Sequence, residues 1–351
     1  CRAAAGCDAD LTGAGGVSES GTPSALLDRD RFGLVFRIVR DLNQFSGKLA
    51  RLPENVPDCQ VDLLRLIFQV QESLGSNDSR VKRMHPMPYG AEVRDAYRWA
   101  DVVCSQLGAY NRAARRAARH RRPIVAFARH SRVDARDYYG TPDLLVYCAS
   151  WIEAQHPWPG RSVVLHPPID GDRYRTAPGE HLTMINLSAE KGGTLLEPLA
   201  RRLPEHRFLA VRGAWGDQVI PPECPPNVRI AANTPDARTV YAQTRILLQP
   251  SVAEGYPRVV LEAAASGIPV VAHPAPGTRA AMADAAIYVD RTDVGGWAEA
   301  IRRLGDPEEY AAWSARARAR FDEHDPAPEL HAFETALLET TRSRPVGAAR
   351  P

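Results

Sequence analysis

Short runs of apolar residues recur through the first half of this chain, and stretches with helical spacing separate them. The apolar runs predict strands at Val102–Ser105, Pro123–Ala128, Leu144–Ala149 and Val163–Leu165. Helices are predicted at Glu92–Trp99 and Asn111–His120. An unbroken apolar strand is buried on both faces, so this alternation indicates a parallel sheet with helices on either side.

The alternation stops at residues 167–180 and then begins again. Several prolines and glycines give this stretch the composition of a linker. Beyond it, strands are predicted at Leu182–Leu187, Phe208–Arg212 and Ile246–Gln249. Helices are predicted at Leu195–Leu203, Ala237–Gln243, Trp297–Glu323 and Glu329–Thr341. A second unit of helices and sheet is therefore expected.

A chain of 351 residues is long enough for two domains of about 150 residues each. We expect an α/β fold in which two Rossmann-like domains face each other across a cleft. The expected parts are an irregular or disordered segment at 1–30, a first domain at 31–166, a linker at 167–180, a second domain at 181–323, a C-terminal helix at 324–341 and a tail at 342–351.

Composition excludes several classes of protein. Hydrophobic residues at 44% and charged residues at 25% are ordinary for a globular chain. A net charge of +2 is too small to indicate a nucleic-acid partner. We find neither a signal peptide nor an apolar run near the roughly 18 residues that span a bilayer. The sequence therefore predicts a cytoplasmic protein.

Neither a disulfide framework nor a metal is expected. The six cysteines contain no Cys-x-x-Cys pair and no histidine at zinc-ligand spacing. An Asp-x-Asp pattern, which some metal-dependent enzymes use, occurs at Asp8/Asp10, Asp28/Asp30 and Asp170/Asp172. Three unrelated contexts indicate chance, so we predict no metal site.

The most informative segment runs from Pro250 to His273 and has the pattern strand, loop, helix, turn, strand. Pro257 suits the first position of a helix, Gly267 suits its C-terminal cap, and Pro269 prevents continuation. The helix then begins at the carboxyl end of a parallel strand. Ligands bind at that edge of such sheets, and a helix N-terminus there attracts phosphate.

Two carboxylates mark this segment: Glu254 in the loop and Glu262 inside the helix. They are placed to bracket one ligand, because a carboxylate accepts two sugar hydroxyls at once in bonds worth roughly 1.5–3 kcal/mol. The alternative is that Glu262 only pairs with Arg258 at i,i+4, while Glu254 is a solvated loop residue.

Two further strand ends carry positive charge. Lys191, one of three lysines in the chain, follows a predicted strand and precedes Gly192 in a glycine turn. Arg212 ends another strand and precedes Gly213, which permits close approach of the backbone. Lys191 is placed to reach a diphosphate; otherwise it is an ordinary surface lysine.

These residues resemble a known family. Glu254 and Glu262, within Glu-Gly-Tyr-Pro and Glu-Ala-x-Ala-x-Gly-x-Pro-Val-Val, are similar to the Glu-x7-Glu signature of family-4 retaining glycosyltransferases, which have the GT-B fold. The likeness extends through Lys191-Gly192, Arg212-Gly213, Pro250-Ser251 and residues 166–170, and covers roughly 144–304.

The resemblance implies a function. The C-terminal domain would bind a nucleoside-diphosphate sugar, and the N-terminal domain a hydroxyl acceptor, with retention and without a metal or cofactor. The implied donor-binding set is Lys191, Gly192, Arg212, Gly213, Glu254, Gly255, Tyr256, Pro257 and Glu262. Within it, Lys191 and Arg212 would hold the diphosphate, Glu254 the sugar, Glu262 the ribose, and backbone near Gly255–Pro257 the phosphates and sugar. The implied catalytic set is His130, Lys191, Arg212 and Glu254.

The sequence departs from the family in two places. Asn186 stands where a typical member has an arginine five residues before the motif lysine, so the diphosphate site loses one charge. Family members open with a strand followed by a Gly-Gly loop; Gly13–Gly16 could be that loop, but Cys1–Thr12 is a poor strand. His130, at a strand end, is either an acceptor-side residue or an ordinary hydrogen-bonded histidine.

One basic stripe lies outside these motifs. Arg112, Arg115, Arg116 and Arg119 share a face of a predicted helix. We interpret it as a solvated face. The other reading is a surface that steers an anionic acceptor, with at most peripheral membrane contact, because alanines flank the arginines.

Two other functions fit the same fold: a catalytically silent protein that binds sugar nucleotides, and a nucleotide-sugar epimerase. The nucleobase, the sugar, the acceptor and the oligomeric state leave no signal in the sequence.

Overall fold

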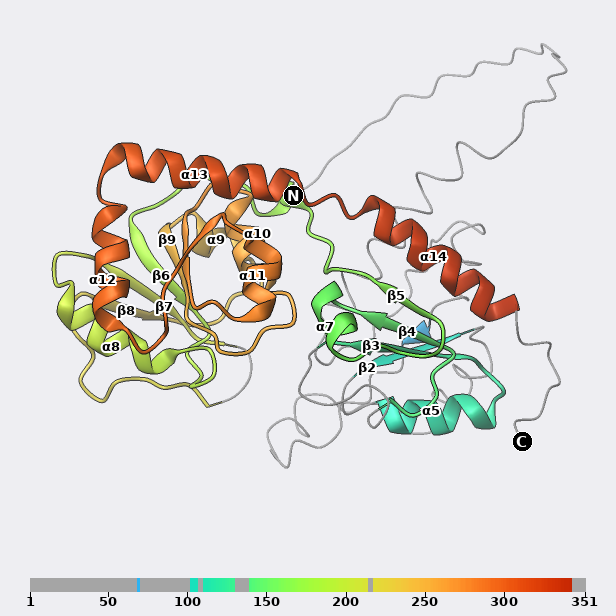
Figure 1. The fold of residues 1–351 in the computed structure, drawn as a ribbon. Helices are drawn as coiled ribbons and strands as arrows, with labels where there is room; N and C mark the ends of the chain where they lie inside the picture. Colours follow the sequence, from blue (N-terminus) through green and yellow to red (C-terminus); the bar gives the residue numbers. More distant parts are fainter. Residues whose placement is uncertain (1–67, 70–101, 107–109, 130–138, 214–216, 343–351) are drawn as a thin grey trace, which may run out of the picture.

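The computed structural model describes residues 68–69, 102–106, 110–129, 139–213 and 217–342. Two α/β units lie side by side in it (Figure 1). Several expectations fall outside the described residues: the irregular segment 1–30 with Gly13–Gly16, the helix at 92–99, and His130. The tail beyond residue 342 also lies outside.

The first unit is built on a five-stranded parallel sheet with the order β1-β2-β3-β4-β5. Its strands are β1 (Phe68–Gln69), β2 (Val103–Gln106), β3 (Ile124–Ala128), β4 (Leu144–Tyr147) and β5 (Ser162–Val164). Every residue of β3 and β4 is buried, as the continuous apolar runs predict. Two helices, α5 (Tyr110–Arg119) and α7 (Ser150–Gln155), pack on this sheet.

The second unit is a six-stranded parallel sheet with the order β11-β10-β9-β6-β7-β8. Its strands are β6 (His181–Ile185), β7 (Phe208–Val211), β8 (Val228–Ala231), β9 (Thr244–Gln249), β10 (Val270–Ala272) and β11 (Ala286–Tyr288). Its helices are α8 (Gly193–Arg202), α9 (Arg238–Tyr241), α10 (Arg258–Ala264), α11 (Pro276–Met282), α12 (Val294–Arg303) and α13 (Pro307–Asp322).

Two boundaries differ from the sequence prediction, and one terminating residue agrees with it. The expected helix over 297–323 is two helices, because Leu304 ends α12 and the Asp306 carboxylate caps α13 by accepting from the amides of Glu308 and Glu309. Pro257 is the residue before α10 and not its first helical residue. The predicted role of Gly267 as a terminating glycine is supported by its φ of 69°.

The chain returns to the first unit at its end. A short 3-10 helix (Gly171–Arg173) lies in the linker after β5. After α13, the last helix, α14 (Ala327–Arg342), packs on β4 and β5 through Leu330, Phe333 and Leu337 (Figure 1). Two segments therefore connect the units. Among the described residues, no helix has the length and hydropathy needed to cross a membrane.

Candidate functional site

The carboxyl ends of β6 and β9 bring the Lys191 turn and the Glu254 loop together. Because the strands are parallel neighbours, the loops that follow them share one edge of the sheet. Gly192 makes this proximity possible. It has a φ of 89°, and a Cβ there would lie 2.4 Å from Pro250 at the end of β9.

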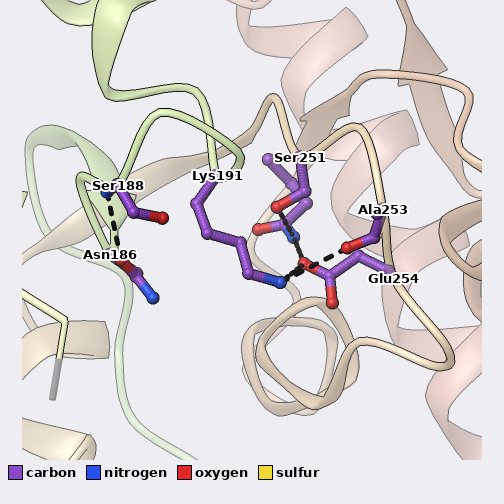
Figure 2. A network of polar contacts seen from close by, with 7 residues as sticks. Asn186, Ser188, Lys191, Ser251, Ala253 and Glu254 are labelled. Carbon is purple, nitrogen blue, oxygen red and sulfur yellow. Dashed lines mark hydrogen bonds and ion pairs between the residues drawn. The ribbon is translucent and has the colours of Figure 1, made fainter. Parts of the chain in front are cut away.

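Lys191 and Glu254 form an ion pair at this edge. Figure 2 shows the lysine side chain extended to the carboxylate, with Nζ 2.6 Å from Oε1. The same carboxylate oxygen accepts a hydrogen bond of 2.9 Å from Nε2 of Gln249. Two hydrogen-bond donors therefore fix the Glu254 carboxylate, so it is not the solvated loop residue of the alternative interpretation.

A pocket of about 510 Å³ opens beside this pair, and both units line it. The second unit contributes Glu190, Lys191, Val252, Ala253, Glu254, Gly255 and Pro276, and the first contributes Arg129, Trp151 and Gln155. The expected cleft thus has a definite place, between α7 with the end of β3 on one side and the Lys191–Glu254 pair on the other.

Arg129 is a pocket residue that the sequence did not single out. It directly follows β3, and its Nε donates to the side chain of Gln106 at the end of β2. Burial lowers the pKa of the guanidinium, yet arginine stays charged at neutral pH. The pocket therefore has a cation from each unit, Arg129 and Lys191. The sequence feature that could have identified Arg129 is its position at the end of a buried apolar strand, just before His130.

Gly255 lies where the second unit meets the first. A Cβ on this residue would lie 2.1 Å from the carbonyl oxygen of Arg129 and 2.9 Å from Sγ of Cys148. Burial raises the pKa of the Cys148 thiol to about 11, so it stays protonated and only packs. The glycine of the Glu-Gly-Tyr-Pro motif is thus required by backbone contact between the units.

Arg212 and Asn186 lie away from the pocket lining. Arg212 is exposed, whereas Asn186 has a φ of 70° and accepts at Oδ1 from the amide of Ser188 (Figure 2). Gln218 joins the two strand ends: its Oε1 accepts from the amides of Leu187 and Gly213, and its Nε2 donates to Asn186. In this structure Asn186 holds a tight turn.

Glu262 is buried, and protein groups occupy both of its oxygens. Oε2 accepts a 2.8 Å hydrogen bond from the hydroxyl of Tyr241, and Oε1 lies 3.0 Å from Nη2 of Arg258. Burial raises the pKa of Tyr241, and the neighbouring Glu262 carboxylate adds to this rise. The i,i+4 pair of the alternative reading is therefore present, and the ribose contact stays a prediction.

Tyr256 of the same motif packs into the connection between the units. Its ring lies 4.4 Å from the ring of His166 and 5.9 Å from that of His324, measured between centroids. His166 also binds Glu329 at the start of α14, with Nδ1 2.7 Å from Oε1. Burial raises the pKa of Tyr256 to about 12, so it stays neutral. This tyrosine therefore links the motif to both connecting segments.

The remaining candidate features of the described residues lie outside the lining of this pocket. In α5, Arg115 and Arg119 are exposed, and Arg112 and Arg116 are partly buried. Asp170 and Asp172 line a different pocket, beside the 3-10 helix. Across the described ranges, no group of three or more His, Cys, Asp or Glu side chains is arranged for a metal. Cys104, Cys148 and Cys224 are free thiols.

Comparison with known sequences points to one class of enzyme. Residues 200–306 match the model of the family described as "Glycosyl transferases group 1". A D-inositol 3-phosphate glycosyltransferase of Mycolicibacterium smegmatis is 29% identical over 177 residues. This match covers 46% of the present chain and 41% of that relative. The chain therefore spans less than half of the relative's length in this match.

Comparison with solved structures shows the fold. HepE from Anabaena, in complex with UDP-glucose, superposes with a TM-score of 0.62 at 16% identity, covering 93% of this chain and 98% of that one. A glycosyltransferase from Rickettsia africae superposes with a TM-score of 0.60 at 14% identity, covering 91% and 97%. The two parallel-sheet units thus have the GT-B arrangement that the sequence predicts.

Proposed function

We propose that this chain is a glycosyltransferase that moves a sugar from a nucleoside-diphosphate sugar to a hydroxyl acceptor. The observation that carries the proposal is the Lys191–Glu254 pair at the wall of a pocket that both units line. The partial family match and the UDP-glucose complex of the structural neighbour support the same donor class.

Each side of the pocket suits one part of the reaction. Glu254 can accept hydroxyls of the donor sugar once its bond from Lys191 is shared with the ligand. Lys191 and Arg129 can stabilise the negative charge that grows on the leaving diphosphate, which is an electrostatic contribution of the protein itself. α7, with Trp151 and Gln155, faces this region from the unit that we propose binds the acceptor.

Three finer features belong to the same proposal. We propose retention of the anomeric configuration, a reaction that needs no metal or cofactor, and a cytoplasmic location. Of the predicted donor residues, Lys191, Glu254 and Gly255 line the pocket; we assign the diphosphate to Lys191 and Arg129 ahead of the exposed Arg212. Gly192 and Gly213 allow the tight turns beside them.

A calorimetric binding screen with UDP, GDP, ADP and dTDP tests this proposal. We expect one nucleotide to bind, and its affinity to fall only a few-fold in Lys191→Ala, since the lysine acts mainly on the charge that develops as the diphosphate leaves. Arg212→Ala is the matched control, because it also removes a cation at a strand end of the same sheet, and we expect a smaller loss. If no nucleotide binds, the proposal is wrong.

Product analysis separates the three activities that fit the fold. A transferase releases nucleotide from the donor, slowly to water and faster with an acceptor. An epimerase changes the donor sugar and keeps the nucleotide attached, and a silent protein binds donor without either change. Mass spectrometry and NMR of the incubated donor distinguish these outcomes, and only nucleotide release supports the proposal.

A further inference from the structure

Trp151 in the first unit makes a direct hydrogen bond to the loop that carries Glu254 in the second. Its indole Nε1 donates to the carbonyl oxygen of Gly255 over 2.7 Å, across 104 residues of sequence. That carbonyl belongs to the residue immediately after Glu254. The same indole side chain lines the pocket, so the bond lies at its wall.

The Glu254–Gly255 backbone is also confined from the other side. α11 begins beside it, and a Cβ on Gly277 would lie 2.2 Å from the carbonyl oxygen of Glu254 and 2.6 Å from that of Gly255. Gly255 itself touches the carbonyl of Arg129. The segment is therefore held between α11 and the first unit, and α7 packs against α11 at the same place.

We propose that Trp151 is a positioning residue, which orients Glu254 through the Gly255 carbonyl when the two units are together. This inference rests on the proposed transferase activity. The hydrogen bond restrains the peptide unit between Gly255 and Tyr256, one residue beyond Glu254, and so limits the movement of the backbone that carries the carboxylate. The wall of the pocket that carries Glu254 then depends on a contact made by the first unit.

Trp151→Phe tests this role, because it keeps an aromatic ring and removes the N–H donor together with part of the indole volume. Loss of one such bond corresponds to a fall in turnover of about 2- to 13-fold, from a net value of roughly 0.5–1.5 kcal/mol. We expect the Kd for the nucleotide alone to stay within about twofold of wild type, because the bond acts on the sugar-side carboxylate and not on the diphosphate.

Trp158→Phe is the matched control. Trp158 is a nearby, partly buried tryptophan of the same unit, and its Nε1 has no hydrogen-bond partner in the part of the chain that the structure describes. The same chemical change there should leave turnover at the wild-type level. A second variant, Gly255→Ala, disturbs the same contact from the other unit and should also lower turnover, because its Cβ meets the Arg129 carbonyl.

The outcomes are distinct. Reduced turnover with unchanged nucleotide affinity in Trp151→Phe, but not in Trp158→Phe, supports positioning. Wild-type turnover in Trp151→Phe overturns it, and so does an equal loss of turnover and nucleotide affinity, which would mean that Trp151 binds the donor itself. If the wild-type protein turns over no donor, the proposed transferase activity is wrong. The positioning role of Trp151, which rests on that activity, is then wrong as well.

Discussion

Lys191 and Glu254 lie 63 residues apart in the chain, yet Nζ of one is 2.6 Å from Oε1 of the other. The lysine also points to the carbonyl of Ala253 at 3.4 Å, so two oxygens of one loop fix its position. This pair joins the loops after β6 and β9. A donor that binds here must share both groups, which makes the pair the centre of the proposed site.

Replacing the lysine should chiefly affect turnover. In Lys191→Ala the leaving diphosphate loses a cation, and negative charge there grows as the glycosidic bond breaks. We expect turnover to fall about 10- to 150-fold, equivalent to one charge-assisted bond of roughly 1.5–3 kcal/mol. Steady-state kinetics with the donor identified by the binding screen measures this. Normal turnover in the variant would remove Lys191 from the site.

Replacing Glu262 tests two roles of its carboxylate, one in folding stability and one in donor binding. Glu262→Ala leaves Arg258 without its carboxylate in a site where the arginine side chain is 17% exposed, so we expect a lower free energy of unfolding by about 3 kcal/mol. If the carboxylate also holds ribose, the Michaelis constant for the donor rises as well. Thermal unfolding and donor kinetics on one sample decide between these roles. Lower stability with an unchanged Michaelis constant contradicts the ribose prediction.

Asn186 should matter for stability more than for chemistry. Asn186→Ala puts alanine at a φ of 70° and removes the acceptor for Ser188, so we expect a loss of about 1–3 kcal/mol. Asn186→Gly loses the same hydrogen bond but tolerates the angle, so it should lose less. Denaturant unfolding of the two variants checks the order. Equal stability of both variants and wild type would contradict the assigned turn role.

Acid should weaken the connection between the units. Burial lowers the pKa of His324, which is stacked on Tyr256 and also faces His166, Glu329 and Arg320. The folded state therefore favours neutral His324. The resulting stabilisation is complete above the ordinary histidine pKa of 6.5 and is lost as the pH falls through the lowered value.

Glu329 extends this effect to lower pH. Burial acts to raise its pKa, but the hydrogen bonds and charge of His166, together with the charge of His324, outweigh burial, and the pKa is lowered overall. The contribution of Glu329 to stability is present above its ordinary pKa of 4.5 and is lost as the pH falls below that value. We expect Tm to fall between pH 7.5 and pH 5.5, and to fall less in His324→Gln. Partly buried His206 and His273, whose pKa values are also lowered, keep part of the pH dependence in the variant. An identical slope in both proteins would contradict this account.

The sequence predicted the strands of both sheets well, because β3 and β4 are continuous apolar runs that only burial on both faces explains. It missed β1, β8 and β11, which are short and lie at the edges of their sheets. In β8 and β11, partly exposed residues weaken the apolar signal. It also joined α12 to α13, although Asp306-Pro307 is a readable helix start.

The site was predictable only in part. Lys191 and Glu254 were found because each belongs to a local pattern of glycines and charges. Arg129 and Trp151 were missed, since their importance comes from the docking of one unit on the other, which no local pattern encodes. The role of Asn186 was also hidden, because neither its left-handed backbone angle nor its hydrogen bond with Gln218, 32 residues later, is visible in a local pattern.

Nucleotide release from the donor by Glu254→Gln tests the central claim most directly. This variant keeps the shape of the side chain and removes the charge that faces Lys191. The account predicts that wild type releases nucleotide from one nucleoside-diphosphate sugar. Glu254→Gln should still bind the free nucleotide, but it should cleave nucleotide from the donor at least 10-fold more slowly, because about 1.4 kcal/mol or more of transition-state stabilisation is lost. Release at the wild-type rate by Glu254→Gln would contradict it.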